Sequence, residues 1–381
     1  MEFTDEQKMI QETVGKLAKE KIEPLAKDAD LSGHSSPEIV SLLAENDLLK
    51  MALPERFGGI GANYTTIAIV VEELAKKDAS TAMILFVTQS LIQILKQWAN
   101  AEQKERFFGQ MSAGNKVNAF SLTEPNYGSE SASIQTKAIL EGDHYIVNGA
   151  KIFVTNGDIA DFLLLFVRTG EGERHKGLSA LVLKKDTEGF LIGKHEDKLG
   201  LRGSDLTELI FEDAPVPRRN LLAQPGKGWD ILVSGGADMR AYGPGAMASG
   251  LAQGALDYAI SYAKDRIQFG RPIADLQGIR FMLADMSIKI EAARSLLYRT
   301  TGLMDSGLKD RGLRSRLVSS TKCFTSDVAM SVTTDAVQIL GGYGVMKDYP
   351  LERMMRDAKM IQIFDGSNQI QRVIVAKNLL S

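Results

Sequence analysis

Asp365 is a candidate for proton chemistry in this sequence. It lies in the stretch from Ile361 to Arg372, where an apolar run is followed by Gly366, Ser367 and a helical pattern. A carboxylate at such a place either caps the helix and interacts with its dipole, or acts as a base whose pKa is shifted by apolar surroundings. The residues alone leave both interpretations open.

A second candidate segment runs from Phe120 to Glu130 and contains several hydroxyl and glycine residues. Hydroxyls and free backbone N–H groups can hydrogen-bond the electron-poor edge of a ring, or a phosphate. The competing interpretation is a polar loop that is stabilised by its own turn chemistry. Composition alone favours the loop.

Two further segments place arginine or glycine at a helix end. Arg266 to Pro272 follows a helical pattern, and its arginine and phenylalanine could clamp an anion and stack a base, or form a solvated helix terminus. Gln338 to Gly344 ends a helical pattern in glycines, which let a phosphate or another backbone approach closely. Because no Gly-x-Gly-x-x-Gly fingerprint follows a strand, the sequence does not predict a Rossmann domain.

The elements that must position these residues fall into three parts. Residues 1–117 have helical spacing with Thr4 as a predicted N-cap. Residues 118–225 contain short apolar runs between turn residues, which predict a small β barrel or sandwich. Residues 226–381 return to long helical patterns, and Ser367 is the predicted cap of the last helix. Together they predict an α+β chain with a central β domain and a C-terminal helical bundle.

Within the β part, Asn148-Gly149 is typical of a tight hairpin turn, because it supplies the positive φ angles that such a turn needs. Further strands are expected at 162–167, 178–183 and 206–211. In the last part, long helices are expected near 229–267, 275–305 and 310–340, the third of which ends at Gly341.

Composition limits the class of protein. The 381 residues carry a formal net charge of −3, with 44% hydrophobic and 24% charged residues, which is ordinary for a globular protein and does not indicate a nucleic-acid partner. The single cysteine and the four scattered histidines predict neither an internal disulfide nor a metal site. The N-terminus lacks an apolar signal region, and no apolar run is expected to reach the ~18 to 20 residues of a membrane-spanning helix, so the expected location is cytoplasmic.

Taken together, the motifs resemble the acyl-CoA dehydrogenase family along essentially the whole chain. The resemblance rests on T-E-P-x-x-G-S at 123–129, on R-x-Q-F-G-R-P-I at 266–273, and on Gln338 to Gly342 continuing to Asp348, Arg353 and Asp357. It implies N-terminal helices, a central β domain and a C-terminal four-helix bundle, assembled as a homotetramer. It also implies bound FAD, an acyl-CoA substrate and electron transfer to an electron-transferring flavoprotein.

The resemblance also implies residue roles. Asp365 corresponds to the base that removes the α proton, and its backbone N–H, together with an FAD hydroxyl, would stabilise the thioester oxygen. The residues expected around the flavin are Phe120, Leu122, Thr123, Phe153 and Thr155, and Ser129 is expected at the FAD and CoA phosphates. The residues expected at a neighbouring subunit's FAD are Arg266, Phe269, Gln338 and Gly342, with Ser367 and Gln369 completing that site. The residues expected to bind the CoA substrate are Ser129, Asp238, Arg240 and Gly366.

The base position departs from the family pattern, which usually has Glu. Asp is one methylene shorter, and a displacement of about 1 Å can cost roughly 100-fold in rate. The position that carries the base in some relatives is Met239 here. Two explanations remain open: a bulky, branched or alicyclic acyl group such as cyclohexanecarboxyl, or a nitroalkane-oxidase-like enzyme that uses Asp without CoA. A non-catalytic flavin-binding protein is a third hypothesis.

Milder departures from the family pattern are Glu130 for Asp and Phe153 for Trp. Compared with the family pattern, the spacing between Arg240 and the stretch at 250–253 is about one residue longer.

Overall fold

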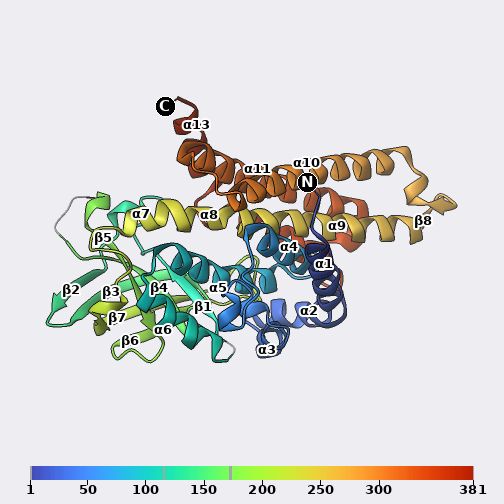
Figure 1. Ribbon diagram of the computed structural model, residues 1–381. Helices are drawn as coiled ribbons and strands as arrows, with labels where there is room; N and C mark the ends of the chain where they lie inside the picture. Colours follow the sequence, from blue (N-terminus) through green and yellow to red (C-terminus); the bar gives the residue numbers. More distant parts are fainter. Residues whose placement is uncertain (1, 115, 171–173, 381) are drawn as a thin grey trace.

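The computed structural model describes residues 2–114, 116–170 and 174–380 (Figure 1). Helices form the first part of the chain, a curled mixed β sheet the middle, and a helical bundle the last part. The predicted α+β fold is therefore confirmed.

The N-terminal helices begin at side chains that satisfy their free N–H groups. Thr4 and Gln7 form the predicted capping box, with the Thr4 hydroxyl accepting the Gln7 N–H at 3.2 Å. Asn63 and Asp78 cap two helices that form much of the core. The helices are α1 (Asp5–Leu17), α2 (Glu23–Ser32), α3 (Pro37–Glu45), α4 (Tyr64–Ala75), α5 (Ala79–Trp98) and α6 (Ala101–Ser112).

Helix α5 is long and apolar enough to cross a membrane, which differs from the expectation that no run reaches this length. Of its most apolar window, 94% is buried inside the protein. Its apolar side chains pack against other helices and the sheet, which accounts for its hydropathy as a core helix.

The β part is one curled sheet of seven strands. Its order is β1-β4-β2-β3-β7-β6, with β5 paired to β4, and β1 runs parallel to β4. Its strands are β1 (Asn118–Ser121), β2 (Lys137–Glu141), β3 (His144–Thr155), β4 (Phe162–Arg168), β5 (Leu178–Lys184), β6 (Phe190–His195) and β7 (Leu206–Pro217).

Strands β4 and β5 are apolar at almost every position because both of their faces are buried. Phe162, Leu164 and Phe166 belong to the core shared with the helices. Leu163 and Leu165, which point to the opposite face, belong to a separate core inside the curl of the sheet. The sheet is thereby fixed against the helical parts on one side.

The predicted hairpin turn at Asn148-Gly149 is wrong. Strand β3 continues through both residues, and the turn that joins β2 to β3 lies at Gly142 and Asp143. Gly149, at φ 143°, occupies an irregularity in the pairing with β7, where an added Cβ would lie 2.8 Å from Thr136. Asn148 exchanges hydrogen bonds of 2.9 Å with Asp213 on β7, so its side chain pairs two strands instead of shaping a turn.

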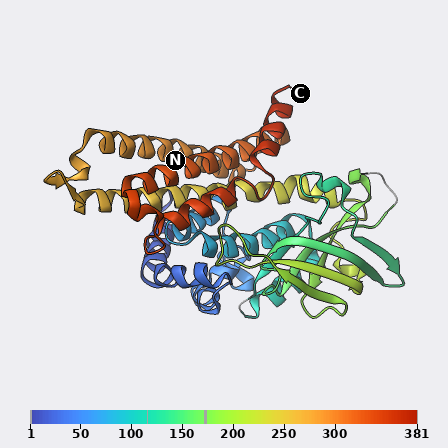
Figure 2. The same ribbon diagram turned by 180° about the vertical axis from the view of Figure 1, so that it is seen from behind.

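The C-terminal part is built of long helices. Residues 228–265 form a nearly continuous helix in which two π turns, 232–236 and 241–245, separate α7, α8 and α9. Its elements are α7 (Gly228–Ile231), α8 (Ala237–Arg240), α9 (Ala246–Asp265), the short hairpin β8 (Ile267–Gln268) and β9 (Arg271–Pro272), α10 (Gln277–Asp305), α11 (Arg311–Leu340), α12 (Leu351–Ile361) and α13 (Asn368–Leu380). Figures 1 and 2 show the β8 hairpin at the end of the molecule remote from the β sheet.

Candidate active site

The loop between α12 and α13 gives Asp365 an unusual backbone conformation. Asp365 and Gly366 both lie in the left-handed region, at φ 53° and 86°. Asp tolerates this region better than most residues, and a Cβ on Gly366 would lie only 2.6 Å from the Gln371 amide nitrogen. Helix α13 then starts at the predicted cap, because the Ser367 hydroxyl accepts the Ile370 N–H at 3.4 Å. The local sequence therefore favours the tight backbone turn that carries Asp365 between α12 and α13.

The Asp365 carboxyl group has the properties of a base. Its Oδ2 atom is buried and has no hydrogen-bond partner among the residues that the structure describes. Burial raises the pKa of Asp365 to about 6, while Arg240 and then Lys322 act to lower it. A carboxyl group that titrates near pH 6 is mostly ionised at neutral pH, and with an unpaired oxygen it can accept a proton from a bound molecule.

The backbone of this loop is held separately from the carboxyl group. The Asp365 carbonyl accepts hydrogen bonds from Arg240 Nε at 2.8 Å and from Gln371 Nε2 at 3.3 Å. The Gly366 carbonyl accepts from Gln371 Nε2 at 2.8 Å and from Lys322 Nζ at 3.1 Å. The loop is thus anchored by cations that also lower the pKa of its acid.

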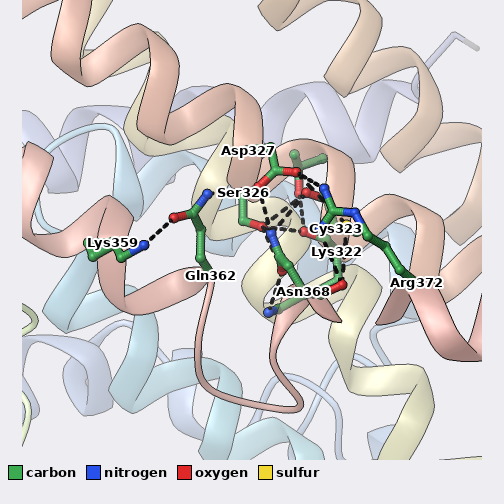
Figure 3. Close-up of polar contacts among 9 residues, drawn as sticks. Lys322, Cys323, Ser326, Asp327, Lys359, Gln362, Asn368 and Arg372 are labelled. Atoms are coloured by element: carbon green, nitrogen blue, oxygen red, sulfur yellow. Dashed lines mark hydrogen bonds and ion pairs between the residues drawn. The ribbon is translucent and has the colours of Figure 1, made fainter. Parts of the chain in front are cut away.

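Lys322 and its polar neighbours were not predicted as part of the site. Figure 3 shows Asn368 turned toward helix α11, where its Oδ1 accepts from Lys322 at 2.9 Å and its Nδ2 donates to Asp327 at 2.8 Å. Asp327 also accepts from Arg372 at 2.7 Å and from Gln362 at 2.7 Å. These contacts tie both sides of the Asp365 loop to one helix. The signal in the sequence was a lysine within the run of small polar residues at 319–326.

Segment 120–123 and strand β3 are brought together as the resemblance implies. The Ile152 N–H donates to the Thr123 carbonyl at 2.9 Å, and the fully buried Lys151 donates to the Leu122 carbonyl at 3.0 Å. Lys151 also pairs with Glu124 at 2.9 Å, and burial lowers the pKa of Lys151 to about 8. These bonds place Leu122 and Thr123 beside the end of β3.

Phe153 interrupts the ladder between β3 and β7. Its φ is 56°, the register shifts between Lys151 and Val154, and 55% of Phe153 is exposed. Thr155, two residues later, is buried. Ser121 nearby has a buried hydroxyl with no partner among the described residues. An exposed aromatic face beside hydroxyl groups and a strand end fits a planar heterocycle such as a flavin.

Three other residues predicted to bind FAD are less enclosed. Phe120 is half-buried and packs against Phe166, with ring centroids 5.2 Å apart. Ser129 is exposed in the loop that follows Tyr127. Gln369 is exposed on the first turn of α13.

A second group of predicted residues lies at a cleft of about 560 Å³ beside the β8 hairpin, which Arg266 and Gly342 line. Arg266 lies over the Tyr343 ring at 5.4 Å and pairs with no carboxylate among the described residues. An added Cβ on Gly342 would meet nothing within 4 Å, so a ligand can reach this backbone. Phe269 is 90% exposed at φ 52°, and Gln338 is exposed at the end of α11.

The structure does not bring these two groups together within one chain. The hairpin that follows Arg266 lies at the opposite end of the molecule from the sheet that carries Phe153 (Figures 1 and 2). The two groups can therefore contribute to one ligand only if a second copy of the chain supplies one of them.

Asp238 and Arg240 occupy different surroundings. Asp238 is buried, and both of its oxygens accept from Arg314, at 2.8 and 2.6 Å. Burial raises the pKa of Asp238, while Arg314 lowers it. Asp238 therefore holds Arg314, whereas Arg240 lies against the Asp365 loop.

Comparison with known proteins gives a consistent result. Family models described as the N-terminal, middle and C-terminal domains of acyl-CoA dehydrogenase match residues 4–115, 119–214 and 226–380. A cyclohex-1-ene-1-carbonyl-CoA dehydrogenase from Syntrophus aciditrophicus is 42% identical over 385 residues, which cover 100% of this chain and 91% of that protein.

Solved structures are similar to this chain over its whole length. The butyryl-CoA dehydrogenase of Megasphaera elsdenii superimposes with a TM-score of 0.95 at 38% identity, covering 100% of both chains. A chain in the structure described as the electron transferring flavoprotein of Acidaminococcus fermentans also has a TM-score of 0.95, at 40% identity, covering 100% of this chain and 99% of that one.

Proposed function

The chain belongs to the acyl-CoA dehydrogenase family, and we propose that it desaturates a CoA thioester between the α and β carbons with Asp365 as the catalytic base. It is an FAD-dependent oxidoreductase, as this family is. The observation that carries the proposed role of Asp365 is its buried, unpaired Oδ2 in a carboxyl group of pKa about 6.

Asp365 accepts the α proton at its carboxylate. FAD, when bound, supplies the acceptor for the hydride that leaves the β carbon, so that loss of a proton and a hydride leaves a carbon–carbon double bond. The thioester oxygen gains negative charge as the proton leaves. The Asp365 N–H donates to no acceptor among the described residues, and it is the donor that this chain offers to that oxygen.

We further propose that each FAD is bound by two subunits. Phe120, Leu122, Thr123, Phe153 and Thr155 would hold the flavin ring, with Ser129 near the phosphates. The support is the separation of the two groups within one chain and the 90% exposure of Phe269. Residues supplied to the neighbouring subunit's FAD would be Arg266, Phe269, Gln338 and Gly342, joined by Ser367 and Gln369. A homotetramer satisfies this requirement.

The proposed substrate is a branched, alicyclic or short acyl-CoA. The shorter reach of Asp365 suits an α carbon that is seated closer to the base, and one relative is named for an alicyclic substrate. Another structural relative is a butyryl-CoA dehydrogenase, so the proposed substrates include short acyl groups. Arg240 and Gly366 would border the thioester and CoA.

The proposed electron acceptor is an electron-transferring flavoprotein. Support comes from the matching chain in the Acidaminococcus fermentans structure, because the description of that structure names an electron transferring flavoprotein. The enzyme with bound product is expected to react poorly with oxygen, because the product excludes oxygen from the flavin.

Anaerobic mixing of the yellow enzyme with straight, branched and alicyclic acyl-CoAs tests the proposal. Rapid bleaching of the flavin by at least one of them is expected, with the fastest rate indicating the acyl class. Bleaching by nitroalkanes but by no acyl-CoA would support a nitroalkane-oxidase-like function instead. A stable yellow colour with every compound would indicate a flavin-binding protein without this activity.

A further inference from the structure

Three residues that are distant in the sequence form a group with metal-ligating atoms away from the site described above. His34 lies between α2 and α3, His195 ends β6, and Asp205 immediately precedes β7. Their ligand atoms all lie within 4.8 Å of one another. The group joins the N-terminal helices to the β sheet.

The distances suit a small ion. Asp205 Oδ1 lies 2.9 Å from His34 Nδ1 and 3.5 Å from His195 Nδ1. Ligand bonds of about 2.0–2.2 Å in a tetrahedral zinc site place neighbouring ligand atoms roughly 3.3–3.5 Å apart. An ion between the three atoms would need His34 to move a few tenths of an ångström away from Asp205, and the two imidazoles, whose ligand atoms lie within 4.8 Å of each other, to reach a similar separation.

Asp205 is already oriented by the backbone around it. Its side chain is only 4% exposed, and its Oδ2 accepts the Ser35 N–H at 2.7 Å. The Asp205 N–H in turn donates to the Ser35 hydroxyl at 2.9 Å. These bonds leave Oδ1 directed at the two imidazoles, as outer-sphere hydrogen bonds do for carboxylate ligands of metals.

Further charged groups lie near the three ligand side chains. Asp158 has a buried Oδ1 with no partner among the described residues, and its carboxyl group interacts with both Asp205 and His195. Lys198 is the opposing positive charge, although burial lowers the pKa of its amino group to about 8 and its Nζ donates to the Ser204 carbonyl. Arg202 adds a second positive charge near Lys198, so charges of both signs surround the three ligand side chains.

We propose that His34, His195 and Asp205 bind a divalent transition-metal ion of the zinc class, with a water molecule as the fourth ligand. Two imidazole nitrogens favour zinc over calcium and magnesium, which prefer all-oxygen sites. The His34 and His195 side chains are 61% and 40% exposed, so an ion can enter from solvent.

The ion would have a structural role next to the proposed flavin edge. Thr155 pairs with Leu206, the residue after Asp205, and the Asn156 N–H donates to the Asp205 carbonyl at 3.3 Å. Zinc bound to His34 on one side and to Asp205 on the other would therefore hold the N-terminal helices against the end of β3.

Isothermal titration of the purified, flavin-containing protein with ZnCl2 tests the site. One zinc per chain is expected for the wild type, with at least about tenfold weaker binding in His34→Ala and in His195→Ala. His144→Ala is the matched control, because His144 contacts Asp143 at 2.6 Å on the exposed end of β3 and belongs to no such group among the described residues. Its zinc binding is expected to equal that of the wild type.

Thermal unfolding provides the second readout. Zinc should raise the Tm of the wild type and of His144→Ala but not that of the other two variants. The absence of saturable zinc binding by the wild type, equal binding by His34→Ala and the wild type, or loss of binding in His144→Ala would each overturn the proposal. Equally tight binding of MgCl2 would overturn the assignment to the zinc class.

Discussion

Lys322→Met should move the pH dependence of flavin reduction to higher pH. Lys322 is fully buried in α11, and its positive charge is one of two that lower the pKa of Asp365. Methionine has a similar length and no charge. The acceptors that Lys322 leaves behind keep other donors, because Gln371 still donates to the Gly366 carbonyl and Ser326 to Asn368 Oδ1. The loop should therefore stay in place while its electrostatics change.

The expected change in the Asp365 pKa is moderate, because Lys322 is the weaker of the two positive charges that lower this pKa. Arg240 is the larger influence on Asp365, so removal of Lys322 should raise the Asp365 pKa by about one unit, or about 1.4 kcal/mol. With a pKa of about 6, roughly half of Asp365 is ionised at pH 6 in the wild type. About a tenth would be ionised in the variant, so the rate at pH 6 should fall roughly fivefold. At pH 8 the loss should be only about a tenth.

Rapid-mixing measurement of flavin reduction between pH 5 and 9 checks this prediction. The control is Lys359→Met, which removes a lysine bonded to Gln362 at 3.0 Å on the exposed side of the same polar cluster (Figure 3). Its profile should match that of the wild type. An unchanged profile in Lys322→Met, or a loss of rate that is equal at all pH values, would refute the electrostatic role of Lys322.

Two further predictions concern the cofactor and the substrate. Arg266→Ala should lower FAD retention and weaken the oligomer together, because the Arg266 guanidinium would pair with a phosphate of the neighbouring subunit's FAD. Flavin absorbance measures the FAD content and light scattering measures the mass of the oligomer. Full flavin content at an unchanged mass would contradict the assignment. Asp365→Glu adds one methylene and should shift the substrate preference toward unbranched acyl-CoAs in the same flavin-reduction assay. An unchanged preference would mean that the length of the base does not select the acyl group.

Local sequence signals predicted the elements where neighbouring residues decide the conformation. Thr4 and Ser367 cap helices as expected, since an N-cap depends on residues only three positions away. Asn148-Gly149 failed because tertiary contacts overrode a local signal. Asn148 pairs with Asp213 on another strand, and Gly149 is pressed against Thr136 in an irregularity of the sheet.

The same distinction holds for the site. Asp365 could be proposed as a base from the sequence because its motif is contiguous. Lys322 contacts the loop from a helix more than forty residues earlier, and no local spacing marks it. The His34, His195 and Asp205 group is spread over 171 positions in the chain, so the four histidines looked scattered before the fold was known.

Flavin reduction by acyl-CoA in Asp365→Asn tests the central claim most directly. The substitution keeps the shape of the side chain and removes the group that accepts the proton, while the loop anchors from Arg240 and Gln371 contact backbone carbonyls and persist. Flavin content should be normal, and flavin reduction should be slower by about 100-fold or more, which is the usual contribution of a general base. Near-normal reduction in this variant would mean that another residue takes the α proton, and it would contradict the assignment of Asp365.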